Sequence, residues 1–283
     1  MRLRRSGRLA ALALAPLLAL TALFALPMAP PPSAANAQGG TVTVEWFGWS
    51  HFRLTSVNGK IIHLNPFIEG NPDATVSVDD ISQADLILPA DGHGDEVGST
   101  VAIAQKTGAR VWASFELGRW IREQGVPQPQ VVSGNQGARM VMDGIVVRTV
   151  NSIHGSSVNP PTSTTPYAGL AAGYVITFEN GWTVYFTGSS AATQDQALWA
   201  ELYKPDAMIF HMSANHDPLD IAMTVRLMTT NNPNLTTLMP HHHRVDPPTG
   251  ATTVADVQAA MAGMGVNIPI TNQVRSQVYS FTK

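Results

Sequence analysis

The chain has 283 residues, of which 44% are hydrophobic and 13% are charged, and its formal net charge is −3. This composition can supply a hydrophobic core and excludes a disordered, low-complexity chain. Because the sequence contains no cysteine, disulfide bonds, cysteine-ligated zinc and thiol catalysis are also excluded.

The first 37 residues have the pattern of a secretory signal peptide. Four arginines within positions 2–8 precede an apolar stretch at 9–26, and a small-x-small sequence ends at Ala37. We expect cleavage after Ala37, which leaves residues 38–283 as one domain without a stable membrane anchor; an uncleaved anchor is the alternative. The predicted location is the periplasm or the cell exterior, by either Sec or twin-arginine export. The remaining chain is acidic, which disfavours nucleic acid as a partner.

The mature part predicts strands first and then alternating helices and strands. Strands are indicated by period-two alternation, short apolar runs and Asn-Gly or Asp-Gly turns, at 41–47, 51–57, 60–65, 84–89, 111–114, 131–132, 139–142, 145–151, 174–178, 183–186, 207–210, 235–239 and 277–282. Helices are indicated by helical periodicity, at about 97–104, 115–124, 193–203, 218–229 and 252–264. Mixed sheets with helices outside them favour an α/β fold, an αββα four-layer sandwich.

Candidate metal ligands and acid–base groups follow several predicted strands. The segment 91–96, with the sequence Asp-Gly-His-Gly-Asp-Glu, comes directly after one strand, and its glycines allow the backbone to fold tightly. The alternative for these residues is a turn followed by a helix start. His154 and the triplet 241–243 follow two other strands. Together these residues favour a metal site over a Ser-His-Asp triad, and the sequence has no G-x-S-x-G motif.

The order and spacing of these motifs resemble the metallo-β-lactamase superfamily, in particular the small metal-dependent hydrolases that include ascorbate-6-phosphate lactonase. The resemblance covers about 41–245 and rests on short segments at 46–50, 64–67, 85–88, 115–117, 154–157, 202–206 and 240–242. It implies the metallo-β-lactamase-like αββα sandwich and a metal-dependent reaction. Since this branch often assembles, a homo-oligomer is a further expectation.

The metal motif departs from the family pattern H-x-H-x-D-H, because its first and last histidines are replaced by carboxylates. The resemblance implies a first metal site of Asp91, His93 and His154. It implies a second, oxygen-rich site of Asp95, Glu96 and His242. Three further positions differ from the residues common in the family: Trp49 replaces a histidine, Asn65 an aspartate, and Ser189 the bridging aspartate.

Two histidines and one carboxylate suit manganese, iron or zinc. We therefore expect one tightly bound divalent metal and a weak second metal or none, although loss of metal binding is also open.

The implied function is hydrolysis of a small ester, lactone, amide or phosphoester by metal-activated water. Asp95 and His242 are the expected catalytic acid–base residues. Several other residues could contact the substrate or support the site, namely Trp49, Ser189, His211, His241 and His243. Two alternatives remain open at this point: a metal-free periplasmic binding protein on the same fold, and an iron-dependent redox or lyase enzyme.

Overall fold

The computed structural model describes residues 39–158 and 165–283. The predicted signal peptide and its cleavage site lie outside the described residues. Within these ranges, no helix combines the length and the apolar character needed to span a membrane.

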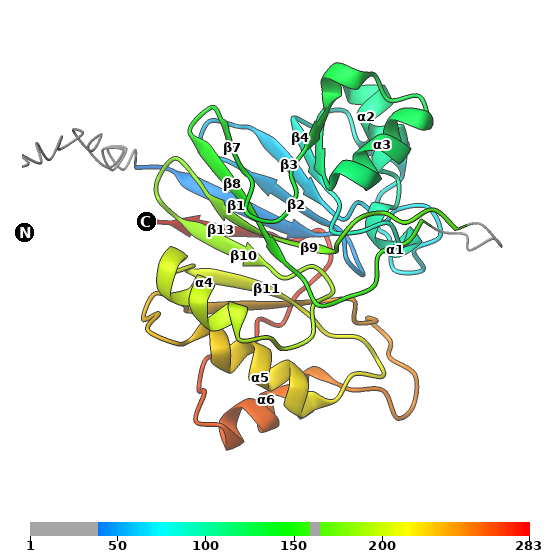
Figure 1. The fold of residues 1–283 in the computed structure, drawn as a ribbon. Coiled ribbons are helices and arrows are strands. Elements are labelled where there is room, and N and C mark those ends of the chain that lie inside the picture. Colours follow the sequence, from blue (N-terminus) through cyan, green and yellow to red (C-terminus); the bar gives the residue numbers. More distant parts are fainter. Residues whose placement is uncertain (1–38, 159–164) are drawn as a thin grey trace, which may run out of the picture. The chain divides into compact units, whose positions relative to one another are not determined.

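Two mixed β-sheets form the centre of the domain (Figure 1). The first has the order β13-β1-β2-β3-β4-β5-β6, with the bounds Val278–Thr282, Thr41–Trp46, Phe52–Thr55, Ile61–Leu64, Leu86–Leu88, Arg110–Ala113 and Val131–Ser133. The second has the order β12-β11-β10-β9-β8-β7, with the bounds Thr237–His241, Ala207–His211, Thr183–Phe186, Ala172–Thr177, Ile145–Asn151 and Arg139–Met142.

Helices cover the outer face of each sheet, so the chain forms the expected αββα sandwich. On the first sheet lie α2 (Thr100–Thr107) and α3 (Phe115–Glu123), and on the second lie α4 (Asp195–Tyr203), α5 (Pro218–Met228) and α6 (Val254–Gly263). The remaining helical segments are short: 3-10 turns at Val78–Asp80 and Gln128–Gln130, and the single turn α1 (Gly94–Val97).

The hydrophobic cores follow this layering. One cluster lies between the sheets and includes Trp46, Phe52, Tyr174 and Phe186, each at most 1% exposed. Two separate clusters pack the helices against the outer sheet faces. Apolar burial of this kind is the main favourable term in folding, and here it fixes the strand ends that carry the polar residues described below.

Two local predictions differ from the structure. The helix expected at 97–104 is divided at Gly98, whose φ of +44° and closeness to the backbone of Pro66 exclude a Cβ there. The strand expected to end at 239 continues through Pro240 to His241. Proline is tolerated because β12 is the edge strand of its sheet.

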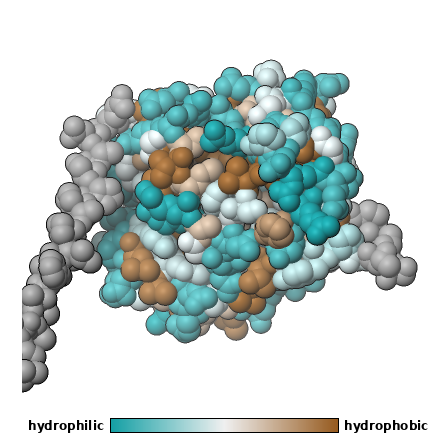
Figure 2. All heavy atoms as spheres, turned by 45° about the horizontal axis from the view of Figure 1, so that its top comes forward, coloured by the Kyte–Doolittle hydropathy of each residue, from teal (hydrophilic) through white to brown (hydrophobic). Residues whose placement is uncertain are grey.

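The surface is mixed in character. On the face shown in Figure 2, hydrophobic residues are separated from one another by polar ones.

Candidate metal centre

The loops at one end of the two sheets bring together the polar residues singled out in the sequence. Asp91 follows β4, His154 follows β8, Ser189 follows β10, and His242 follows β12, while His211 is the last residue of β11. These strands belong to both sheets, so the site is assembled across the sandwich.

Asp91, His93 and His154 form the one group, within the described parts of the chain, with the geometry of a metal site. One potential ligand atom from each residue lies within 4.8 Å of the others. The Nδ1 of His93 is 3.2 Å from Nε2 of His154 and 3.5 Å from Oδ1 of Asp91. Oδ2 of Asp91 is buried and has no hydrogen-bond partner. An unpaired carboxylate oxygen beside two converging imidazoles fits a divalent cation.

The backbone around Asp91 explains how this group forms. Oδ1 of Asp91 accepts a hydrogen bond from the backbone N–H of His93 at 2.8 Å, which closes a tight turn. Gly92 lies against the loop that follows His154, and a Cβ there would be 2.6 Å from the Cβ of Ala168. Burial and the negative charge of Glu96 raise the pKa of Asp91 well above its usual value.

Glu96 is the centre of a second cluster, and protein donors satisfy its carboxylate. Asn65 Nδ2 donates to one oxygen and Ser189 Oγ to the other, while Nε2 of His242 is 3.2 Å from Oε1. The side chain of Asn65 is fixed in turn, because its Oδ1 accepts from the backbone N–H of Ala90 at 2.7 Å. Asn65 and Ser189 therefore act as the donors that a carboxylate at position 96 requires; an aspartate in either place would repel it.

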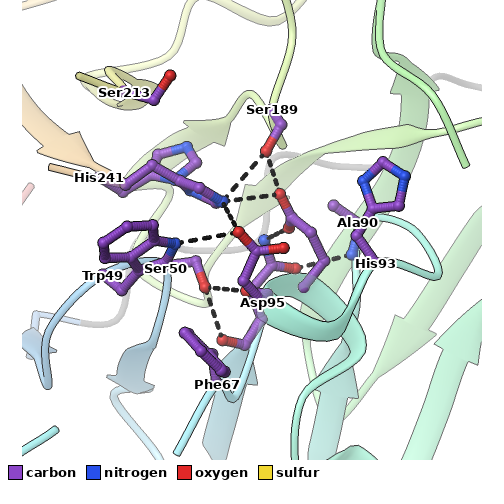
Figure 3. Close-up of polar contacts among 12 residues, drawn as sticks. Trp49, Ser50, Phe67, Ala90, His93, Asp95, Ser189, Ser213 and His241 are labelled. Carbon is purple, nitrogen blue, oxygen red and sulfur yellow. Dashed lines mark hydrogen bonds and ion pairs between the residues drawn. The ribbon is translucent and has the colours of Figure 1, made fainter. Parts of the chain in front are cut away.

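Asp95 lies beside this cluster and faces the cavity. Its Oδ2 accepts a hydrogen bond from Nε1 of Trp49 at 3.2 Å and is 3.5 Å from Nε2 of His242. Figure 3 shows Trp49, Asp95 and Ser189 directed toward one point. The side chain of Asp95 is 36% exposed, compared with 1% for Glu96, so Asp95 is the more accessible of the two carboxylates.

The charges in this cluster are complementary. Burial alone would lower the pKa of His242, but the charge of Glu96 and hydrogen bonds with Asp95 and Glu96 outweigh burial and raise the pKa to about 9. Burial alone would raise the pKa of Asp95, but the hydrogen bond and charge of His242, together with the hydrogen bond from Trp49, lower that pKa to about 2. The surroundings of His242 therefore favour an imidazolium between the two carboxylates.

A cavity of about 260 Å³ joins the two clusters. Its lining includes most of the residues predicted from the sequence, namely Trp49, His93, Asp95, His154, Ser189, His211 and His242. It also includes Ser213, Asn215 and His216, which were not predicted to belong to the site. Their position directly after β11, which ends in His211, was the available signal.

The histidine triplet 241–243 is divided between three environments. His242 faces the cavity, and His241 is completely buried behind it. His243 stacks on Trp46 with ring centroids 4.7 Å apart and lines a different cavity. His243 therefore lies outside the lining of the cavity that His242 faces, and the backbone between the two residues is left-handed at His242.

Comparison with known proteins identifies the family. Residues 61–262 match the model described as the Beta-lactamase superfamily domain. The chain belongs to this superfamily. Among its relatives, a UPF0173 metal-dependent hydrolase of Rubrobacter xylanophilus is 32% identical over 192 residues, which cover 67% of this chain and 78% of the relative. One of Myxococcus xanthus is 32% identical over 216 residues, which cover 75% and 74% respectively.

A solved structure supports the superfamily fold independently. The metallo hydrolase Igni18 of Ignicoccus hospitalis superposes with a TM-score of 0.70 at 21% identity, covering 85% of this chain and 98% of that one. This likeness confirms the superfamily sandwich. The finer resemblance to ascorbate-6-phosphate lactonase stays a prediction.

Proposed function

We propose that this protein is an exported metal-dependent hydrolase that acts on a small ester, lactone, amide or phosphoester. Relatives named metal-dependent hydrolases support the class of reaction. The observation that carries the proposal is the convergence of Asp91, His93 and His154 beside a cavity that His93, His154, Asp95 and His242 line. The N-terminal sequence pattern supports export.

We assign the metal to Asp91, His93 and His154, and we expect one ion of manganese, iron or zinc per chain. A divalent cation held there would polarise a substrate carbonyl or phosphoryl oxygen and lower the pKa of water. We expect no tightly held second ion, because Glu96 already accepts hydrogen bonds from Asn65 and Ser189 and faces Nε2 of His242.

Two other side chains that line the cavity would supply the groups for proton transfer. Asp95 is the exposed carboxylate at the cavity and is oriented by Nε1 of Trp49, so it would position a water molecule and accept its proton. His242 presents Nε2 between Asp95 and Glu96, from where it would donate a proton to the leaving group. The cavity of about 260 Å³ suits a small molecule or a small reacting group.

Elemental analysis of the mature protein, purified without chelator or affinity metal, tests the proposal. We expect about one equivalent of manganese, iron or zinc, and His93→Ala should remove it, since a ligand nitrogen is lost. His216→Ala is the matched control, because His216 lines the same cavity outside the ligand group and should leave the metal content unchanged.

The metal-loaded protein would then be assayed with a panel of lactones, esters, amides and phosphoesters. A wild-type protein that takes up no metal on titration would contradict the proposal and would favour a binding protein. Equal metal content in wild type and His93→Ala would show that the ligands lie elsewhere.

A further inference from the structure

The side chain of His241 lies between the backbone carbonyl of Gly188 and the side chain of His242, and it forms a hydrogen bond with each of them. It is the last residue of β12 and is completely buried. Its Nε2 is 3.2 Å from the carbonyl oxygen of Gly188, and its Nδ1 is 2.7 Å from Nδ1 of His242. The other nitrogen of His242, Nε2, faces Asp95 and Glu96. Each nitrogen of the two rings therefore has a polar neighbour.

The carbonyl oxygen of Gly188 determines which ring nitrogens of His241 and His242 carry a hydrogen. A carbonyl oxygen only accepts, so Nε2 of His241 must carry a hydrogen and donate it. A neutral imidazole carries one N–H, which leaves Nδ1 of His241 as an acceptor. The described contacts of the His241 ring are with Phe186, His211, His242 and backbone, with no carboxylate to favour a second proton. Nδ1 of His242 must then be the donor in the contact between the rings.

Both ends of this connection are fixed by backbone geometry. Gly188 has a φ of +56°, and a Cβ there would be 2.3 Å from the carbonyl oxygen of Ala172, so this turn requires glycine. His242 also has a left-handed backbone, with a φ of +64°, and its N–H donates to the carbonyl oxygen of Trp49 at 3.0 Å. These contacts hold the backbone at both ends, and the hydrogen bond between the rings holds the side chain of His242.

We propose that His241 is a positioning residue that holds His242 in the form protonated at Nδ1 and directs Nε2 toward Asp95 and Glu96. Nε2 is then the nitrogen of His242 that faces the cavity, where Asp95 lies. Because the connection ends at a backbone carbonyl, His241 offers no route for a proton away from His242. The inference deepens the role given to His242 in the proposed function.

Long-range proton–nitrogen correlation spectra of chelator-treated, histidine-labelled protein test this arrangement without any assay of hydrolysis. Signals are assigned with His241→Asn and His242→Gln. In the wild type we expect His241 to be protonated at Nε2 alone and His242 to be protonated at Nδ1. A His241 ring protonated at Nδ1, or a His242 ring without a hydrogen at Nδ1, would overturn the proposal.

Two variants of His241 then separate positioning from packing. In His241→Asn, the amide oxygen can still accept from Nδ1 of His242, whereas His241→Leu keeps the bulk and removes the acceptor. Both variants are assayed with a substrate that the wild type hydrolyses. We expect His241→Leu to lower kcat by about tenfold or more with little change in KM. The kcat of His241→Asn should lie much closer to that of the wild type. Equal losses in both variants, with the wild-type protonation pattern of His242 retained, would mean that His241 acts only through packing.

The two proposals fail in different ways. Spectra that show the expected protonation pattern in a protein without metal or hydrolytic activity would leave the positioning role intact and refute the hydrolase. The reverse pattern in an active enzyme would refute the positioning role alone.

Discussion

The backbone N–H of His242 donates to the carbonyl oxygen of Trp49 at 3.0 Å, and both residues have left-handed backbone conformations, with φ of +64° and +53°. Such conformations cost free energy for residues other than glycine and persist where the surrounding structure holds them. Here the contact joins the turn after β1 to the loop after β12. It brings Trp49 and His242 together, with ring centroids 5.9 Å apart, and both side chains contact Oδ2 of Asp95.

Replacement of Trp49 by phenylalanine tests this arrangement at Asp95. Trp49→Phe keeps an aromatic ring and the backbone contact but removes the N–H that donates to Oδ2 of Asp95. We expect a fall in kcat because Asp95 loses one of its two orienting contacts, and a stability loss of about 1 kcal/mol. Trp120→Phe, in α3 on the outer face of the first sheet, is the control and should leave kcat unchanged. Equal kcat in wild type and Trp49→Phe would remove Trp49 from the site.

The imidazolium of His242 predicts how stability depends on pH. Its pKa is raised from 6.5 to about 9 in the folded protein, so the stabilisation is fully present below pH 6.5 and is lost as the pH rises through 9. For chelator-treated protein we expect the free energy of unfolding to fall by about 3 kcal/mol across this interval. Denaturant titrations at several pH values measure it.

His242→Gln should give a flatter profile over the same interval. His216→Gln serves as the control, because the pKa of His216 is lowered by burial and its contribution is lost as the pH falls, outside this window. An identical alkaline fall in wild type and His242→Gln would show that another group causes it.

Asn65 and Glu96 form a donor–acceptor pair that can be reversed. Asn65→Asp places a second carboxylate against buried Glu96 and removes the Nδ2 donor, so we expect a loss of about 2–4 kcal/mol in the unfolding free energy. The left-handed φ of +40° at position 65 is tolerated by both asparagine and aspartate.

The exchanged pair Asn65→Asp with Glu96→Gln restores one donor and one acceptor at unchanged net charge. Thermal and denaturant unfolding should show that it recovers more than half of the loss. Additive effects of the two substitutions would mean that the residues do not interact.

We expect replacement of Ser189 by aspartate to increase the number of metal ions bound per chain. Ser189→Asp replaces a hydroxyl that donates to Glu96 by a carboxylate, so three carboxylates and His242 then surround one point. A second divalent cation relieves this repulsion. We expect metal content to rise above that of the wild type on manganese titration, while chelator-treated Ser189→Asp is less stable than chelator-treated wild type. Ser190→Asp, one residue further along the same turn, is the control. Unchanged occupancy in Ser189→Asp would contradict the role of Ser189 as the residue that replaces a bridging ligand.

The sandwich was predictable because it depends on local patterns, whereas the group of Asp91, His93 and His154 was implied by the resemblance to the superfamily. Strand periodicity placed Asp91 and His154 at strand ends, and strands of the two sheets finish at a common edge. The direction of a side chain beyond a strand was not predictable in the same way. His242 and His243 are neighbours, yet they face different cavities, because the turn at His242 depends on a hydrogen bond to Trp49, almost 200 residues earlier in the chain.

The role of Asn65 could also not be predicted from the sequence. Its amide is needed because Glu96 is buried against it, and that contact joins the end of β3 to α1. The break at Gly98 has a similar origin, since the backbone of Pro66 and Phe67 occupies the space that a side chain would fill. In both positions a distant segment, rather than local propensity, decided which residue fits.

The antiparallel pairing of β13 with β1 has a consequence for biosynthesis. Thr41 is opposite Thr282 in this pairing, so a strand that is synthesised much later covers this edge of β1. Until then, β1 has an open edge on this side, which is a template for pairing with other chains. Contacts between segments so far apart in the sequence also slow folding. We therefore expect truncation within 278–283 to increase the aggregation of newly made chains, although none of these residues lines the cavity.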